Sequence, residues 1–301
     1  MRNLEKMEIY LKAGKIASTV LKETRSKVRP GVNFSQICEQ IENRIRELGG
    51  EPAFPTNICV NEIAAHDTAE IEDIREVHDG DVVKIDIGVH VDGYIADTAI
   101  TVNFSEYYAT MTTANMEVLN LALKKIKPGE SIGEVGNIVY SSALSMGYKV
   151  VTNLSGHELG QYQIHAGQSV PNTPVNGFIG RFGVGRCYAI EPFLTSNNAA
   201  AYVEETDKAA IYSIVKRKRL KDQVADRFLE KAWERRKTLP FSARWFKDLY
   251  DKNELLRALD YLAKNKVIRA YPVLKEATDQ VVCQFEHTVF ITEKNTIITT
   301  I

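Results

Sequence analysis

The sequence contains few cysteines, and none of them lie close together. The four are Cys38, Cys59, Cys187 and Cys283, and no two of them form a Cys-x-x-Cys pair. Spacing this wide argues against a disulfide framework and against a cysteine-based zinc site. It fits a reducing compartment, so we expect a cytoplasmic protein.

The sequence also lacks long apolar runs and a strong net charge. No run approaches the roughly 20 apolar residues of a membrane-spanning helix. Charges occur throughout the N-terminal stretch that ends at Glu23, which is unlike a signal peptide. A net charge of -1 gives no general indication of a nucleic-acid or membrane partner. We therefore expect a globular protein with no membrane partner and no specific nucleic-acid recognition.

An internal repeat is present at an offset of 98 residues. "RPGVNFSQICEQIENRIRELGG" from Arg29 aligns without gaps to "KPGESIGEVGNIVYSSALSMGY" from Lys127. Each copy has Pro-Gly, a cap-type residue (Asn33 or Ser131), helical apolar spacing and a closing glycine. Each copy is preceded by a helical pattern, at 4–27 or 106–125, and followed by strand segments. This organisation predicts an α+β fold with two ααβ halves around a pseudo-twofold axis.

A basic stretch interrupts the second half. From Lys216 to Arg269 there are 17 Lys and Arg residues against 8 Asp and Glu residues, and both tryptophans lie here. The apolar pattern of this stretch is helical, and strand character returns at "VVCQFEHTVFIT". We expect residues 206–270 to form a helical insertion subdomain. Residues 1–205 and 271–301 would then form the main, catalytic domain.

The segment "KIDIGVHVDGYIADTA" has the pattern of a hairpin, yet each of its strands carries an aspartate. A turn centred on Val91-Asp92 would set Asp86 directly opposite Asp97 on one face of the sheet. Aspartate is a poor strand former, and like charges directly opposite each other repel. The pattern therefore indicates a cation between the two carboxylates.

Further charged and imidazole side chains occur in strand-like segments of the second half. They are His157 and His165 in "SGHELGQYQIHAG", Glu191 in "CYAIEPF" and Glu286 in "CQFEHTVFIT". Buried charges are rare unless they are paired or bound to metal. Two divalent ions about 3.5–4 Å apart would neutralise these carboxylates and activate a water molecule. Carboxylates with an imidazole suit Mn²⁺, Fe²⁺, Co²⁺ or Zn²⁺ and do not select among them.

These four motifs together resemble the metal-binding strands of the methionine aminopeptidases, which share the pita-bread fold with prolidase, X-Pro aminopeptidase and creatinase. The resemblance covers essentially the whole chain. The insertion between Glu191 and Glu286 is similar to that of type 2 methionine aminopeptidases. The lack of a polybasic N-terminal tract and of a Cys-rich zinc domain resembles their short archaeal form. The resemblance implies a pita-bread metallopeptidase with two divalent ions. It implies removal of the initiator methionine from nascent peptides by metal-activated water, with preference for small second residues.

The resemblance also implies roles for individual residues. Asp86 would chelate one ion, Asp97 and Glu286 would bridge both ions, and His157 and Glu191 would complete the second. His66 and His165 match the two metal-free active-site histidines of the family, and Glu191 is also the candidate for moving the proton. The repeat supports the histidine pair, because His66 lies 35 residues after Gly31 and His165 lies 36 after Gly129. The implied methionine slot involves Phe54, Ile164, His165, Phe193 and Tyr271.

Two alternatives remain open at the level of sequence. An Xaa-Pro peptidase of the same fold would use the same five ligands. A non-catalytic homologue would bind RNA or ribosomes through the basic insertion, whose run "KRKR" suits phosphate. We prefer the interpretation as a methionine aminopeptidase. Its partners would be nascent polypeptide N-termini, with the ribosome surface as a further candidate, and we expect a monomer.

Overall fold

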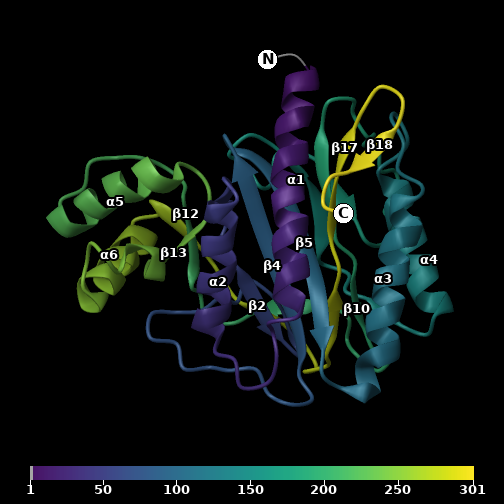
Figure 1. The fold of residues 1–301 in the computed structure, drawn as a ribbon, viewed down its shortest axis with the longest axis horizontal. Helices are drawn as coiled ribbons and strands as arrows, with labels where there is room; N and C mark the ends of the chain where they lie inside the picture. Colours follow the sequence, from purple (N-terminus) through teal and green to yellow (C-terminus); the bar gives the residue numbers. More distant parts are fainter. Residues whose placement is uncertain (1–2) are drawn as a thin grey trace.

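The computed structural model describes residues 3–301, in which helices pack on antiparallel sheets (Figure 1). Met1 and Arg2, which the predicted catalytic domain includes, lie outside the described residues. The helices are α1 (Asn3–Arg25), α2 (Phe34–Glu47), α3 (Ala109–Leu123), α4 (Gly133–Ser145), α5 (Gln223–Arg236) and α6 (Lys252–Lys264), with short 3-10 turns at Glu106–Tyr108 and Ala243–Phe246. Within residues 3–301, no helix is both long enough and apolar enough to span a membrane.

The first half is a four-stranded sheet covered by two helices. Its strands are β1 (Glu51–Pro52), β2 (Asn57–Val60), β4 (Val82–Val91) and β5 (Tyr94–Asn103). β4 pairs with the other three, and α1 lies along the β4–β5 hairpin (Figure 1). Alternate residues of β4, such as Val83 and Ile85, are buried with α1 and α2 in one apolar core. The other face of the hairpin is therefore left free for Asp86 and Asp97.

The second half repeats this arrangement with shorter strands. They are β6 (Lys149–Val150), β7 (Ser155–Leu159), β8 (Ser169–Pro171), β9 (Cys187–Ile190), β10 (Phe193–Thr195), β16 (Val282–Gln284), β17 (His287–Ile291) and β18 (Thr296–Ile298). They form one sheet in the order β18-β17-β9-β7-β8 and a second in the order β16-β10-β6. Helices α3 and α4 share a separate apolar core with these strands.

Backbone hydrogen bonds support the view that the two halves are copies. Gly31 N donates to Val77 O at 2.7 Å, and Gly129 N, 98 positions later, donates to Phe182 O at 2.9 Å. Both glycines have positive φ, 83° and 78°, which explains why each copy needs glycine at this point. The predicted duplication is thus visible in the hydrogen bonds that anchor each second helix.

One of the two predicted helix caps is correct and the other is wrong. The side chain of Asn33 accepts from Ser35 N and caps α2 as expected. Ser131 does not cap α4, which begins at Gly133 after Ile132. Ser131 instead forms an antiparallel β-bridge with Arg181, and the position directly before the helix is taken by Ile132.

The two halves meet where β5 lies against the chain between β16 and β17. Glu286 N donates to Ala99 O at 3.0 Å, and Thr98 Oγ1 donates to Glu286 O at 2.7 Å. Thr288 Oγ1 accepts from Asp97 N at 2.8 Å. These bonds bring Asp97 and Glu286, which are far apart in sequence, to neighbouring positions.

The predicted insertion, residues 206–270, and the segments that flank it contain strands as well as the expected helices. Strands β12 (Ile211–Ile214), β13 (Phe241–Ser242) and β14 (Ile268–Tyr271) form a sheet in the order β13-β12-β14, and α5 and α6 share its apolar core. Strands β11 (Val203–Glu205) and β15 (Leu274–Glu276) pair beside β3 (Ile63–Ala65). The expectation that strand character returns only near residue 281 was therefore wrong. The subdomain boundaries at 206 and 270 stay a prediction.

Candidate metal centre and active-site cavity

The β4–β5 hairpin presents Asp86 and Asp97 on the same face, with a register that differs from the predicted one. The turn falls at Asp92-Gly93, so Asp86 lies opposite Ala99 and Asp97 lies opposite Gly88. Asp92 and Gly93 both have positive φ, 51° and 85°, which suits a two-residue hairpin turn. The prediction of directly opposed aspartates was wrong by two residues. A shift of two keeps both side chains on one face, as diagonal neighbours.

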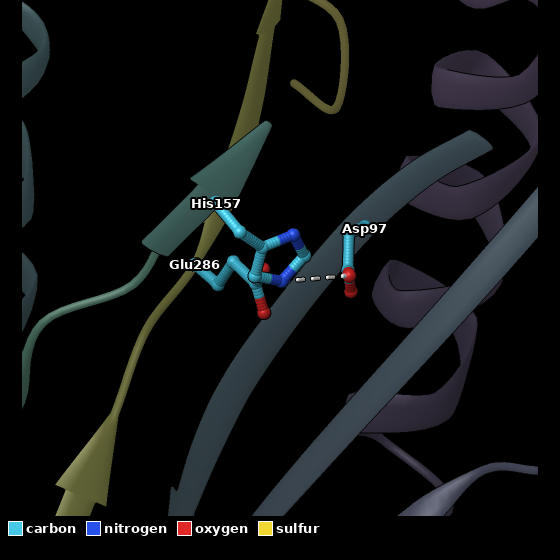
Figure 2. A group of neighbouring side chains, drawn as sticks. All are labelled: Asp97, His157 and Glu286. Atoms are coloured by element: carbon cyan, nitrogen blue, oxygen red, sulfur yellow. Dashed lines mark ion pairs between the residues drawn. The ribbon is translucent and has the colours of Figure 1, made fainter. Parts of the chain in front are cut away.

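The second half contributes His157, Glu191 and Glu286 to the same place. His157 lies in β7, Glu191 follows β9 and Glu286 precedes β17. Figure 2 shows His157 on β7, Asp97 on β5 and Glu286 on the segment before β17, pointing toward one another. Single ligand atoms of these three side chains lie within 4.8 Å of one another. His157 Nε2 is 3.8 Å from Asp97 Oδ2 and 3.4 Å from Glu191 Oε1.

Four carboxylates lie buried at this site, and each disfavours the charged form of its neighbours. Burial raises the pKa of Asp86 to about 7. Burial and the neighbouring carboxylates raise the pKa values of Asp97, Glu191 and Glu286 well above their usual range. Within residues 3–301, three buried carboxylate oxygens have no hydrogen-bond partner: Asp86 Oδ1, Asp97 Oδ1 and Glu286 Oε1.

These observations fit a divalent cation. Unpaired buried carboxylate oxygens are costly, and an ion supplies the missing positive charge. Burial lowers the pKa of His157 to about 3, so its imidazole is neutral and can act as a ligand. Oxygen and imidazole donors suit divalent ions such as Mn²⁺, Fe²⁺, Co²⁺ and Zn²⁺. The chain therefore holds a divalent-metal site.

Sequence reasoning missed Gln284, which lies beside this group. Gln284 Nε2 is 3.4 Å from Glu191 Oε2 and 3.4 Å from Glu286 Oε2, so one amide serves two carboxylates. Its backbone is fixed to β5 through Thr101 Oγ1, which donates to Gln284 O at 2.7 Å. The residue stands in the quoted strand "CQFEHTVFIT", where a buried glutamine two positions before Glu286 was the available signal.

A cavity of about 280 Å³ opens directly beside the carboxylates. All eleven residues that the sequence predicted for the site line it: Phe54, His66, Asp86, Asp97, His157, Ile164, His165, Glu191, Phe193, Tyr271 and Glu286. Residues that sequence reasoning did not single out also line it, among them Asn57, Ile211 and Pro240. Both Ile211 and Pro240 belong to the predicted insertion, residues 206–270, which therefore forms part of the cavity wall.

The two predicted histidines reach the cavity from different loops. His66 has φ 67°, an uncommon value for a residue with a side chain, and its N–H donates to Asn57 Oδ1 at 2.8 Å. His66 Nδ1 lies 3.2 Å from Pro272 O, so Nδ1 carries the proton and Nε2 is a free acceptor. Burial lowers the pKa of His66 to about 4. The ring of His165 lies 4.4 Å from that of His157, centroid to centroid.

Comparison with known proteins defines the class. Residues 8–293 match metallopeptidase family M24, and the chain belongs to that family. The methionine aminopeptidase of Methanocaldococcus jannaschii is 43% identical over 299 residues, which are 99% of each chain. The resemblance stated from the sequence motifs is confirmed.

Solved structures confirm the fold. A thermophilic Arx1 superimposes with a TM-score of 0.83 at 17% identity, over 98% of this chain and 90% of that chain. The methionine aminopeptidase of Rickettsia prowazekii superimposes with a TM-score of 0.71 at 18% identity, over 99% of this chain and 97% of that chain. The chain has the predicted α+β pita-bread fold.

Proposed function

We propose that this protein is a metallo-aminopeptidase that removes the initiator methionine from polypeptides, with preference for a small second residue. The observation that carries the proposal is that the four carboxylates and His157 line a partly apolar cavity of about 280 Å³. The 43% identity to a methionine aminopeptidase over nearly the full length supports the substrate. The free α-amine of the substrate would bind beside the metal site, so that only the first residue is removed.

Two divalent ions are proposed for the site, from the group Mn²⁺, Fe²⁺, Co²⁺ and Zn²⁺. Their ligands would be Asp86, Asp97, His157, Glu191 and Glu286. When bound, such ions polarise the scissile carbonyl and lower the pKa of water. The four carboxylates together carry four negative charges, which two divalent ions balance. This balance favours two ions over one.

The two metal-free histidines would position the peptide. His66 is neutral, with Nδ1 bound to Pro272 O, so its Nε2 would accept a hydrogen bond from a peptide N–H. His165 would hydrogen-bond the carbonyl oxygen as negative charge develops on it. Glu191, which lines the cavity beside the other carboxylates, would pass the proton to the leaving nitrogen.

The methionine side chain would occupy the apolar part of the cavity. Phe54 and Phe193 are buried, at 7% and 2% exposure, and both line it. Ile164, His165 and Tyr271 complete the proposed slot. A flexible thioether offers burial and soft contacts to aromatic rings, which such a lining supplies.

The test is peptide turnover after chelation and metal return. The ion-free protein should not cleave Met-Ala-Ser, and added Mn²⁺ should restore cleavage. Asp97→Asn should stay inactive after Mn²⁺ addition, whereas Asp92→Asn at the exposed turn of the same hairpin should recover. Activity that survives both chelation and Asp97→Asn would overturn the metal assignment. Efficient cleavage of Ala-Pro-Ala alone would instead identify an Xaa-Pro peptidase.

The partners and location follow from this activity. Nascent polypeptide N-termini would be the substrates, and the enzyme would act as a cytoplasmic monomer. All four cysteines are buried and free, which suits a reducing compartment. The basic stretch could bring the enzyme to the ribosome surface by electrostatic attraction. Co-sedimentation with ribosomes at low salt would test this, and absence of binding would remove that partner.

A further inference from the structure

Gly88 lies on the site face of β4, yet the ring of Phe54 covers it. Gly88 is opposite Asp97 and two positions after Asp86, so a side chain there would point toward the cavity. We propose that Gly88 determines substrate specificity, because the absence of a side chain lets Phe54 lie flat on the strand and keeps the first-residue slot long. This inference rests on the proposed aminopeptidase function.

The space above Gly88 is filled by Phe54. A Cβ atom at position 88 would lie 2.3 Å from Phe54 Cε1, 2.5 Å from Phe54 Cδ1 and 2.9 Å from Ala53 Cβ. These distances are far below van der Waals contact. The φ of Gly88 lies outside the left-handed region, so its backbone would accept alanine. The Phe54 ring is therefore the nearest obstacle to a side chain at this position, and the methyl group of Ala53 is the next.

Phe54 lies in a bulge between β1 and β2, and hydrogen bonds fix the backbone of this bulge. Ala53 N donates to Gly88 O at 2.8 Å, while Asn57 already lies opposite Asp86. The chain thus takes four steps from Ala53 to Asn57 where β4 takes two, and the extra residues lift the Phe54 ring over the sheet.

Arg236 locks this bulge. Its Nη2 donates to Pro52 O at 2.8 Å and to Ala53 O at 3.0 Å, and the side chain is buried at 7% exposure. The same group donates at 3.0 Å to the carbonyl oxygen of Pro240, a residue that lines the cavity. A methyl group at position 88 could not push the backbone away without breaking these bonds. The ring of Phe54 would instead rotate into the cavity.

The second half reaches the same result by another route. In its register, Ile190 lies opposite His287 and Phe193 lies opposite Gln284, so Glu191 lies opposite Glu286. Phe193 then stands two positions after Glu191, as Gly88 stands two positions after Asp86. One half supplies its phenyl ring from the strand itself. The other leaves a glycine and supplies the ring from the bulge.

The experiment measures selectivity between two unbranched first residues of different length. The substrates are Met-Ala-Ser and norvaline-Ala-Ser, the second of which has a shorter side chain. Gly88→Ala should lower the ratio of kcat/KM values, methionine over norvaline, by about tenfold, the usual effect of a methylene-sized change in an apolar pocket. The Mn²⁺-induced rise in melting temperature should remain, because the ligands do not move. Val91→Ile, which adds one carbon to the opposite face of β4, should leave the ratio unchanged.

A second variant separates the clash from general damage. Phe54→Ala removes the ring that meets the new methyl group, so it should cost less stability in the Gly88→Ala protein than in the wild type. An unchanged ratio in Gly88→Ala, or an equal stability cost of Phe54→Ala in the two backgrounds, would overturn the inference. A wild-type protein that cleaves neither peptide would overturn the proposed function, whereas wild-type cleavage with an unaltered variant ratio would overturn only the role of Gly88.

Discussion

Replacing Asp97 by asparagine should stabilise the ion-free protein and remove most of its response to divalent ions. Asp97 is 3% exposed, its Oδ1 has no hydrogen-bond partner within residues 3–301, and burial together with Asp86 and Glu191 raises its pKa. An unsatisfied buried group of this kind costs about 1–3 kcal/mol. Asparagine removes the charge and keeps the shape. The ion-free variant should therefore melt about 2 °C or more above the ion-free wild type.

The response to ions should run in the opposite direction. An ion present at about 100 times its dissociation constant stabilises the folded state by about 2.7 kcal/mol. For a chain of this size that corresponds to a rise in melting temperature of roughly 5 °C. The variant lacks one of the proposed bridging carboxylates and should gain less than about 2 °C. The order of the two melting temperatures should thus reverse when Mn²⁺ is added.

Differential scanning calorimetry with and without chelator, at pH 7.5, measures both effects. Asp92→Asn is the matched control, because Asp92 lies in the turn of the same hairpin, is exposed and has a φ of 51° that asparagine tolerates. Its two melting temperatures should equal those of the wild type. The reasoning is refuted if ion-free Asp97→Asn is less stable than ion-free wild type, or if its response to Mn²⁺ is undiminished.

Three further predictions concern other parts of the chain. Glu42→Ala leaves the buried guanidinium of Arg244 unpaired and should lower the free energy of unfolding by about 3–5 kcal/mol in urea titrations; a loss below about 1 kcal/mol would contradict this. Burial lowers the pKa of His90 to about 4, and its Nδ1 accepts from Gly93 N at 3.2 Å, so stability present above pH 6.5 should fall as the pH drops toward 4, with a smaller slope in His90→Gln. His66→Ala should lower kcat/KM by about 10²-fold or more and leave the Mn²⁺-induced stabilisation intact; loss of both would make His66 structural.

Most of the metal centre could be predicted from the acidic residues that stand in strand-like segments. Strand periodicity fixes which face a side chain occupies, so Asp86 and Asp97 could be assigned to one face even with the wrong turn. The pairing partner depends on whether Val91-Asp92 or Asp92-Gly93 forms the turn. The positive φ values of Asp92 and Gly93 settle it, and the Asp-Gly pair was the sequence signal for that turn.

The strands β12, β13 and β14 of the predicted insertion could not be recognised from the sequence for a different reason. Segments β12 and β14 have 4 residues each and β13 has 2, which is too short for an alternating pattern to be distinguished from one turn of helix. Their pairing is non-local, since Ile211 lies opposite both Ser242 and Tyr271. Sequence periodicity reports local structure, so it could not show that residues of this insertion line the cavity.

The duplication explains how a nearly symmetric fold makes an asymmetric site. In the first half Asp86 lies opposite Ala99, whereas in the second half Glu191 lies, by register, opposite Glu286. Two residues further along β4, Gly88 lies opposite Asp97. Two residues after Glu191, Phe193 lies opposite Gln284. A carboxylate in place of Gln284 would add a fifth negative charge and would remove the amide that serves Glu191 and Glu286. The neutral residue at this position therefore keeps the site at four carboxylates, the charge that the two proposed divalent ions would balance. Gln284→Glu should make the ion-free protein less stable while leaving its fold in the presence of Mn²⁺ intact.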